Sequence, residues 1–288
     1  MPDSKQWISE NHRDQQMLSF PIKEKLFSQQ SQFQKVEIFE TTSHGRLLVN
    51  DGCFMLSERD EAIYHEMMAH VPLFVHPKPQ RVLVIGGGDG GTAREVLRHS
   101  RVEQVVMVEI DRVVVEASRE YLPQTASRLE DPRLKLVIDD GVKFAREASE
   151  KSFDVVLVDS TDPVGPAQPL FGPEFYGDIS RLLNEGGIVV AQGESPFYEL
   201  ATQRSMLQVM GGHFPVVMPY NFCNLTYPGG LWSFMWASKG PHPLKDFEPQ
   251  LVEKLELSLH YYNAEIHRGS FALPQFQRQA LSDCIRGA

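Results

Sequence analysis

Acidic side chains stand directly after several apolar runs of the sequence, at positions that could carry chemistry. A single carboxylate at such a position is most simply a helix cap or a turn residue. Several carboxylates brought together at low dielectric repel one another unless a cation joins them. The pattern therefore favours a site for a cationic ligand, and the residues that share it are Asp89, Glu109, Asp140, Asp159, Asp162 and Glu194.

A glycine-rich turn supplies a second candidate feature. In "VLVIGGGDGGTAREV", residues 82–96, an apolar strand leads into the turn and then into a predicted helix. Gly86, Gly88 and Gly91 fit the G-x-G-x-x-G pattern of nucleotide-binding folds. Glu109 ends the next predicted strand and suits a bidentate hydrogen bond to ribose hydroxyls. These residues predict a nucleoside site.

Asp89 narrows the choice of nucleoside because it places a carboxylate inside this turn. It would repel the pyrophosphate of NAD or FAD, which disfavours a hydride-transfer enzyme. S-adenosylmethionine has no phosphate but carries a carboxylate, which Asp89 would repel unless the ligand's amine took the contact. Decarboxylated S-adenosylmethionine presents only a sulfonium and an ammonium, so it fits the turn best. Asp140 and Gly141, after the third predicted strand, are placed to meet its adenine.

The elements that must position these residues follow from hydrophobic patterning. Residues 17–56 read as short antiparallel strands with turns near 43–45 and 50–52. From residue 81 the pattern changes to strands alternating with helices, which is typical of an open parallel sheet. We expect an α/β protein with an N-terminal β-domain over 1–56 and a catalytic α/β domain over 57–288. The strands predicted in the second part are 81–86, 104–110, 134–139, 153–160 and 186–193, with a hairpin of 214–220 and 231–238 at its edge.

A helix is predicted directly after the N-terminal strands. Ser57 followed by Asp60 is a possible capping pair, and Pro72 and Pro77 are expected to close the helix. His65 and His70 on it resemble a zinc motif, but five residues separate them, so they lie about 140° apart around a helix. We therefore expect no metal site here.

Composition excludes several classes of function. The net charge of −10 and the dispersed basic residues disfavour a nucleic-acid binder. No apolar run approaches the roughly 18 residues of a membrane span, and the polar N-terminus lacks the core of an export signal. Only three cysteines occur, which argues against a disulfide framework. We expect a cytoplasmic protein without a membrane or nucleic-acid partner.

The sequence strongly resembles the polyamine aminopropyltransferases, the spermidine synthase family. The matching stretches run along almost the whole chain and include "ERDEAIYHEMMAHVPL", "VLVIGGGDGGTAREV", "FDVVLVDSTDPVGPAQPLF" and "TYPGG". The resemblance implies transfer of an aminopropyl group from decarboxylated S-adenosylmethionine to an amine such as putrescine, with release of methylthioadenosine. It also implies a methyltransferase-like Rossmann-type sheet beside a small N-terminal β-domain, no permanently bound cofactor, and a homodimer or homotetramer.

The resemblance assigns roles to individual positions. Asp159 falls at the position of the general base, and burial together with Asp162 should raise its pKa toward that task. The amine acceptor would be surrounded by Tyr64, Asp159, Asp162, Gln192 and Tyr227. The nucleoside and its aminopropyl tail would be held by Gln34, His65, Gly86, Gly88, Asp89, Glu109, Asp140 and Gly141.

Two departures from the family pattern leave the acceptor open. Met55 stands where glutamine is common, and Leu225 stands where proline is frequent, in a stretch over 219–226 that should border the acceptor. Cadaverine and spermidine therefore remain alternatives to putrescine. An amine N-methyltransferase that uses intact S-adenosylmethionine is a further alternative, as is a catalytically silent binding module, which Asp159, Tyr64 and Tyr227 argue against.

Overall fold

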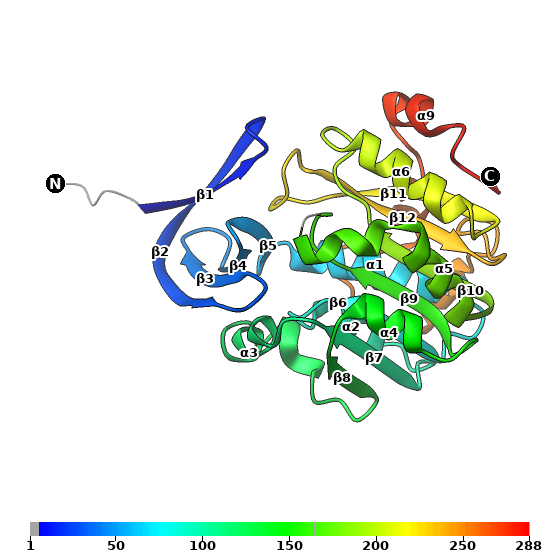
Figure 1. Cartoon of the computed structure of the whole chain (residues 1–288), viewed down its shortest axis with the longest axis horizontal. Coiled ribbons are helices and arrows are strands. Elements are labelled where there is room, and N and C mark those ends of the chain that lie inside the picture. The colour runs from blue at the N-terminus through cyan, green and yellow to red at the C-terminus, as the bar shows by residue number, and fades with distance from the viewer. Residues whose placement is uncertain (1–5, 164, 288) are drawn as a thin grey trace.

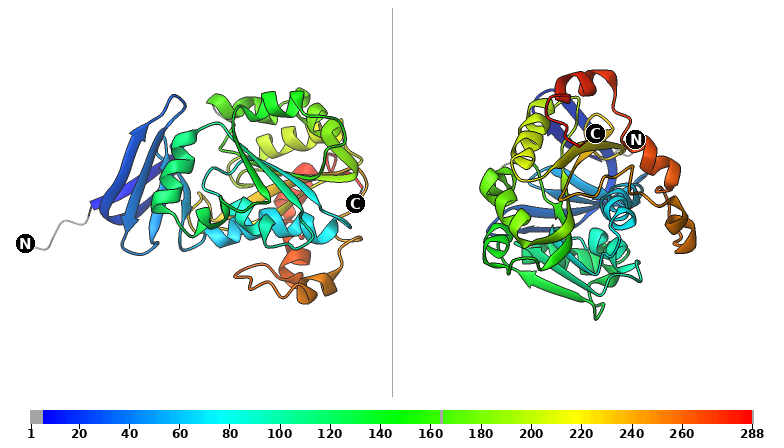
Figure 2. Two further views of the ribbon diagram at one scale, coloured as in Figure 1. Left: turned by 90° about the horizontal axis from the view of Figure 1, so that it is seen from below. Right: turned by 90° about the vertical axis from the view of Figure 1, so that its right-hand side faces the viewer.

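The computed structural model describes residues 6–163 and 165–287, which form two β-sheets with helices around the larger one (Figure 1). The smaller sheet stands at one end of the molecule, beside the larger α/β part (Figure 2). Among the described residues, no helix has both the length and the apolar character needed to cross a membrane.

The smaller sheet is an antiparallel meander in which each strand pairs with the next one along the chain. Val36, Ile38 and Leu48 on one face pack against helix α3 (Arg112–Tyr121) of the larger part. The expected turns join the third strand to the fourth and the fourth to the fifth. The strands are β1 (Gln6–His12), β2 (Gln16–Gln30), β3 (Lys35–Thr41), β4 (Arg46–Asn50) and β5 (Cys53–Ser57).

Strand β1 lies outside the strands predicted from the sequence, which began near residue 17. It pairs with β2 from Gln6 opposite Ile22 to His12 opposite Gln16. Trp7 and Ile8 are its only large apolar residues. β1 lies at the edge of the sheet with one face open to solvent, so it needs few apolar side chains. A polar edge strand gives little hydrophobic signal.

The larger sheet has five parallel strands, extended at one edge by an antiparallel hairpin. Its strand order is β11-β12-β10-β9-β6-β7-β8. The predicted fold class is confirmed: an α/β protein with an N-terminal antiparallel sheet and a Rossmann-like open sheet. The strands are β6 (Arg81–Gly86), β7 (Gln104–Glu109), β8 (Leu134–Ile138), β9 (Phe153–Asp159), β10 (Leu183–Gln192), β11 (Val216–Cys223) and β12 (Leu231–Ser238).

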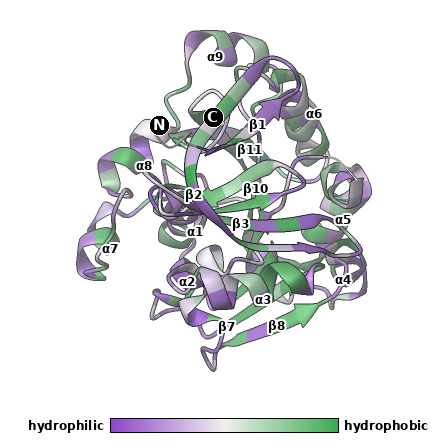
Figure 3. Cartoon of the chain, turned by 90° about the vertical axis from the view of Figure 1, so that its left-hand side faces the viewer, coloured by the Kyte–Doolittle hydropathy of each residue, from purple (hydrophilic) through white to green (hydrophobic). Residues whose placement is uncertain are grey.

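Both faces of this sheet are buried beneath helices, so the central residues of its strands are apolar, as they are in β10 (Figure 3). Val82 and Val84 of β6 face one core, and Leu83 and Ile85 face the other. The first core is covered by α1 (Glu61–Val75), α2 (Gly91–Leu97) and α8 (Ala264–Ser270). The second core is covered by α4 (Gly141–Glu147), α5 (Pro173–Leu182), α6 (Leu200–Gly211) and α9 (Gln275–Leu281). Three short elements complete the described helices: α7 (Pro249–Lys254), η1 (Thr125–Arg128) and η2 (Gly165–Phe171).

Helix α1 differs from its sequence prediction at both ends. Asp60 precedes its first residue but its side chain caps no helical N–H; instead it accepts hydrogen bonds from Ser57 and from the backbone and hydroxyl of Thr226. Pro72 lies inside the helix, which continues to Val75. The last turn persists because its apolar side chains are buried in the core, which outweighs the hydrogen bond that proline removes.

Candidate active site

A cavity of about 580 Å³ opens at the carboxyl ends of β6, β7 and β9. The chain first adds β7 and β8 on one side of β6 and then places β9 on the other side. This reversal of strand order is where open α/β sheets bind their ligands. Residues of the N-terminal sheet, including Cys53 and Met55, close the cavity from the opposite side.

Every residue to which the family resemblance assigns a role lines this one cavity, whereas Gly91 and Glu194, which the sequence patterns also indicated, do not. The individual roles of the lining residues stay predictions at this point. They are Gln34, Tyr64, His65, Gly86, Gly88, Asp89, Glu109, Asp140, Gly141, Asp159, Asp162, Gln192 and Tyr227.

The glycine turn brings three of these side chains together. Gly86 has φ +83°, and a Cβ there would collide with the backbone oxygen of Asp159, whose strand pairs with β6. A Cβ on Gly91 would collide with the ring of His65. Only glycine at both positions lets β9 and helix α1 approach the turn that carries Asp89.

Asp159 is held by hydrogen bonds to both carboxylate oxygens. Tyr64 donates to Oδ1 at 2.8 Å, and Thr92 donates to Oδ2 at 2.6 Å. Burial and the negative charge of Asp89 raise the pKa of Asp159, while His65 and the two hydroxyls oppose this shift. The raised pKa and the effect of burial were expected, but the expected carboxylate was wrong: the neighbouring carboxylate that raises the pKa is Asp89, not Asp162.

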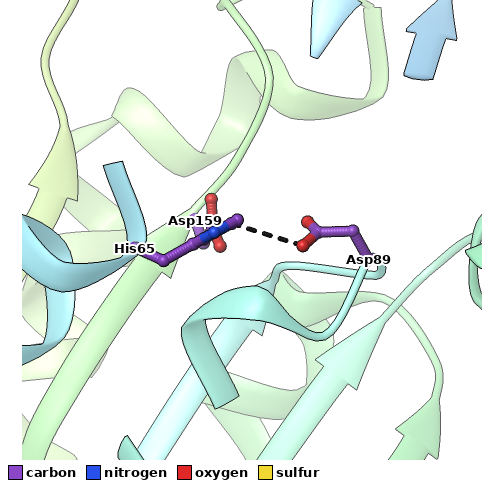
Figure 4. Close-up of side chains that lie close together, drawn as sticks. All are labelled: His65, Asp89 and Asp159. Atoms are coloured by element: carbon purple, nitrogen blue, oxygen red, sulfur yellow. Dashed lines mark ion pairs between the residues drawn. The ribbon is translucent and has the colours of Figure 1, made fainter. Parts of the chain in front are cut away.

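His65 lies between two carboxylates, and its Nδ1 is 2.6 Å from Glu61. Its Nε2 is 3.3 Å from Asp89, the ion pair drawn in Figure 4. Burial alone would lower the pKa of His65, but Asp89 and Glu61 raise it to about 10. Ligand atoms of His65, Asp89 and Asp159 lie within 4.8 Å of one another, as in a metal site. A doubly protonated imidazole has no free lone pair for a metal, so we interpret this group as a buried ion pair beside a second carboxylate.

Glu109 and Gln34, which both line the cavity, are fixed by a common partner, Asp111. Glu109 accepts from the backbone N–H of Asp111 at 2.8 Å, and Gln34 donates to the Asp111 carboxylate at 3.1 Å. Burial raises the pKa of Glu109 to about 7. Asp140 is exposed and lines the cavity, and its carboxylate caps helix α4 through the N–H groups of Val142 and Lys143.

A second group of buried carboxyls lies around Asp162. Gln192 donates to Asp162 at 3.4 Å and to Glu194 at 3.0 Å. Burial raises the pKa of Asp162. The pKa of Glu194 is raised mainly by burial and next by the negative charge of Asp162. Burial also raises the pKa of Glu10 to about 7. A cation near these carboxyls would relieve the cost of ionising them.

Tyr227 lines the cavity, and its hydroxyl is tied to the N-terminal sheet. Its hydroxyl donates to the backbone oxygen of Met55 at 2.8 Å, while its ring meets that of Tyr64 edge-on. The stretch over 219–226, expected to border the acceptor as a loop, is only partly a loop, because residues up to Cys223 belong to the buried strand β11. Leu225 is 54% exposed and does not line the cavity.

Sequence reasoning missed three residues that support the site. Thr92 comes directly after the G-x-G-x-x-G pattern and looks like an ordinary helix residue in the sequence. Glu61 looks like an acidic residue in the first turn of a helix. Glu10 lies in strand β1, which was not predicted. The usable signal was the position of Thr92 and Glu61 on the two segments that carry Asp89 and His65.

Comparison with known proteins agrees with this geometry. The family model for the spermine/spermidine synthase domain matches residues 61–248, and the model for the spermidine synthase tetramerisation domain matches residues 6–58. A polyamine aminopropyltransferase of Alkaliphilus metalliredigens is 44% identical over 96% of this chain and 98% of its own length. One of Methanocaldococcus jannaschii is 43% identical over 97% of this chain and 96% of its own.

Solved structures agree as well. A spermidine synthase in complex with the transition-state analogue AdoDATO has a TM-score of 0.95 and 42% identity, covering 98% of this chain and 97% of that one. The spermidine synthase from Thermotoga maritima has a TM-score of 0.93 and 42% identity, covering 98% and 96%. The resemblance inferred from the sequence is confirmed. The chain belongs to the spermine/spermidine synthase family, and it is a transferase of the polyamine aminopropyltransferase type.

Proposed function

We propose that the protein transfers the aminopropyl group of decarboxylated S-adenosylmethionine to a diamine, with putrescine the first candidate, and releases methylthioadenosine. The observation that carries this proposal is the carboxylate of Asp89, which lies in the glycine turn at the cavity wall beside Asp159. A ligand with its own carboxylate or phosphate would be repelled there, and a sulfonium with an ammonium tail would be attracted.

The reaction balances with one proton acceptor. The amine nitrogen forms a bond to the propyl carbon next to sulfur, the carbon–sulfur bond breaks, and its electron pair turns the sulfonium into a neutral thioether. The leaving group therefore needs no general acid. A primary amine has a pKa near 10, so freeing its lone pair at pH 7 costs about 4–5 kcal/mol. Asp159, with its raised pKa, is the proposed base that accepts the proton.

The remaining residues divide between the two substrates. Gln34, His65, Gly86, Gly88, Asp89, Glu109, Asp140 and Gly141 are proposed to hold the donor. Tyr64, Asp162, Gln192 and Tyr227 are proposed to hold the acceptor. The hydroxyl protons of Tyr64 and Tyr227 already have partners, so both oxygens would act toward an ammonium as acceptors. Both substrates are cationic, which agrees with the carboxyl groups around the cavity.

A second part of the proposal concerns which amine accepts the aminopropyl group. Met55 lines the cavity, and its thioether offers neither the donor nor the acceptor of an amide. We hypothesise that it makes the acceptor end more apolar and admits longer amines. We also propose a cytoplasmic homodimer or homotetramer, supported by the match of residues 6–58 to a tetramerisation domain.

A product survey by mass spectrometry tests the proposal. The enzyme is incubated with decarboxylated or intact S-adenosylmethionine and with putrescine, cadaverine or spermidine in turn. Aminopropylated product with the decarboxylated donor alone is expected, and methylated amine would overturn the assignment. The Met55→Gln variant is the matched control for acceptor choice. A clean preference of the unmodified enzyme for putrescine over both longer amines would refute the Met55 hypothesis while leaving the transfer reaction intact.

A further inference from the structure

Thr92 contacts the proposed base from behind the cavity wall. It is the second residue of α2, its side chain is fully buried, and its hydroxyl donates to Asp159 Oδ2 at 2.6 Å. Thr92 is not among the residues that line the cavity, whereas Tyr64, the donor to the other oxygen, is. A substrate can therefore rearrange the hydrogen bond from Tyr64 but cannot reach Thr92.

Burial and nearby carboxylates oppose the ionisation of Asp159, whereas His65 and the hydroxyl of Tyr64 favour it. Asp89 from the glycine turn and Glu109 from β7 bring negative charge toward it, and Tyr64 and Tyr227 from the facing elements are neutral. His65 of α1 is the cation in this group. A hydroxyl has one proton to donate, and a carboxylate oxygen accepts it best when ionised. The bond from Thr92 therefore favours the form of Asp159 that can take a proton.

The same segment also fixes the backbone of the base. Gly87 donates its N–H to the Asp159 backbone oxygen at 2.9 Å, and Thr92 lies three residues after Asp89 of the same turn. Both the main chain and the carboxylate of Asp159 are thus tied to the segment that carries Asp89.

We propose that Thr92 is a positioning residue that keeps the Asp159 carboxylate ionised and oriented for proton transfer from the acceptor amine. This inference rests on the proposed function. Losing the hydroxyl removes a hydrogen bond that stabilises the ionised form, so the base should ionise only at higher pH. Donor binding should change little, because Thr92 lies outside the cavity.

The test compares Thr92→Val, which keeps the shape without the hydroxyl, with Thr92→Ser, which keeps the hydroxyl. The pH profile of kcat/KM for the acceptor is measured from pH 5 to 9 for both variants and the unmodified enzyme. We expect the acid limb of Thr92→Val to move up by about one pH unit, with about tenfold lower rates on that limb. Thr92→Ser should keep the limb in place. The Kd of methylthioadenosine should stay within about twofold for all three, as measured by calorimetry.

The outcomes distinguish a failure of the Thr92 role from a failure of the proposed function. If the unmodified enzyme transfers the aminopropyl group and the Thr92→Val profile coincides with it, the positioning role is wrong and the function stands. A Thr92→Ser limb that moves as far as that of Thr92→Val would also refute the role. If the unmodified enzyme transfers no aminopropyl group, both the proposed function and the role of Thr92 are refuted. Should Thr92→Val not fold, Thr92→Ala removes the same hydroxyl without crowding and must show the same shift.

Discussion

At the scale of single residues, His65 links stability to pH. Its pKa is raised by Asp89 and Glu61 from an ordinary 6.5 to about 10, so the folded state holds this proton more tightly than the unfolded state. The resulting stabilisation is fully present below pH 6.5 and is lost as the pH rises through 10. The Tm of the unmodified protein should fall as the pH rises from 6.5 to 10, and the Tm of His65→Gln should fall less steeply over the same range. The exposed His213→Gln is the control, and an equal slope in His65→Gln would contradict the ion pair.

Asp159 is the residue on which turnover should depend most. Asp159→Asn keeps the shape and the hydrogen-bonding capacity of one oxygen but cannot accept the amine's proton. We expect kcat to fall at least about a hundredfold, as for loss of a general base, with donor affinity changed only a few fold. Asp162→Asn is the matched comparison and should retain more activity. Single-turnover rates and calorimetry give both quantities, and a variant that keeps its rate would show that Asp159 is not the base.

At the scale of elements, Asp60 joins helix α1 to the segment that carries Tyr227. Its carboxylate accepts from the N–H groups of Leu225 and Thr226 at 2.8 and 2.9 Å, and it is buried. Asp60→Ala should release this segment, raise the KM for the acceptor more than that for the donor, and lower the free energy of unfolding by about 2 kcal/mol. Asp60→Asn keeps one acceptor oxygen and should be intermediate. Equal rises in both KM values would argue against a specific effect on the acceptor end.

At the scale of the whole molecule, the outer face of the N-terminal sheet carries two exposed apolar side chains among polar ones. Trp7 and Met17 are 57% and 65% exposed, and the β1–β2 register places them on the same side of the sheet. Exposed apolar residues on one face are typical of an interface. We expect light scattering to give a dimer or tetramer, and the double variant Trp7→Lys with Met17→Lys to lower the mass. Phe276→Lys, at another exposed aromatic residue, should not. A monomeric unmodified protein would contradict the oligomer.

The sequence could predict the features that are encoded by residues close together in the chain. The glycine turn and the apolar parallel strands are local patterns, so the open sheet and the residues around the cavity were predictable. The role of Asp60 was not, because its partner Thr226 is 166 residues away in the chain. The neighbour of Asp159 was mistaken for the nearby Asp162, because the strand order that sets β6 beside β9 cannot be seen from spacing alone. Strand β1 was missed because an edge strand can be polar.

The central claim is that the cleft accepts a dication without an acid group of its own. Calorimetric titration of the enzyme with decarboxylated and with intact S-adenosylmethionine tests it most directly, with Asp89→Asn as the matched variant. We predict that the decarboxylated form binds about a hundredfold more tightly and that Asp89→Asn brings the two affinities to within about tenfold. Equal affinities in the unmodified enzyme, or a preference that Asp89→Asn leaves unchanged, would contradict the account.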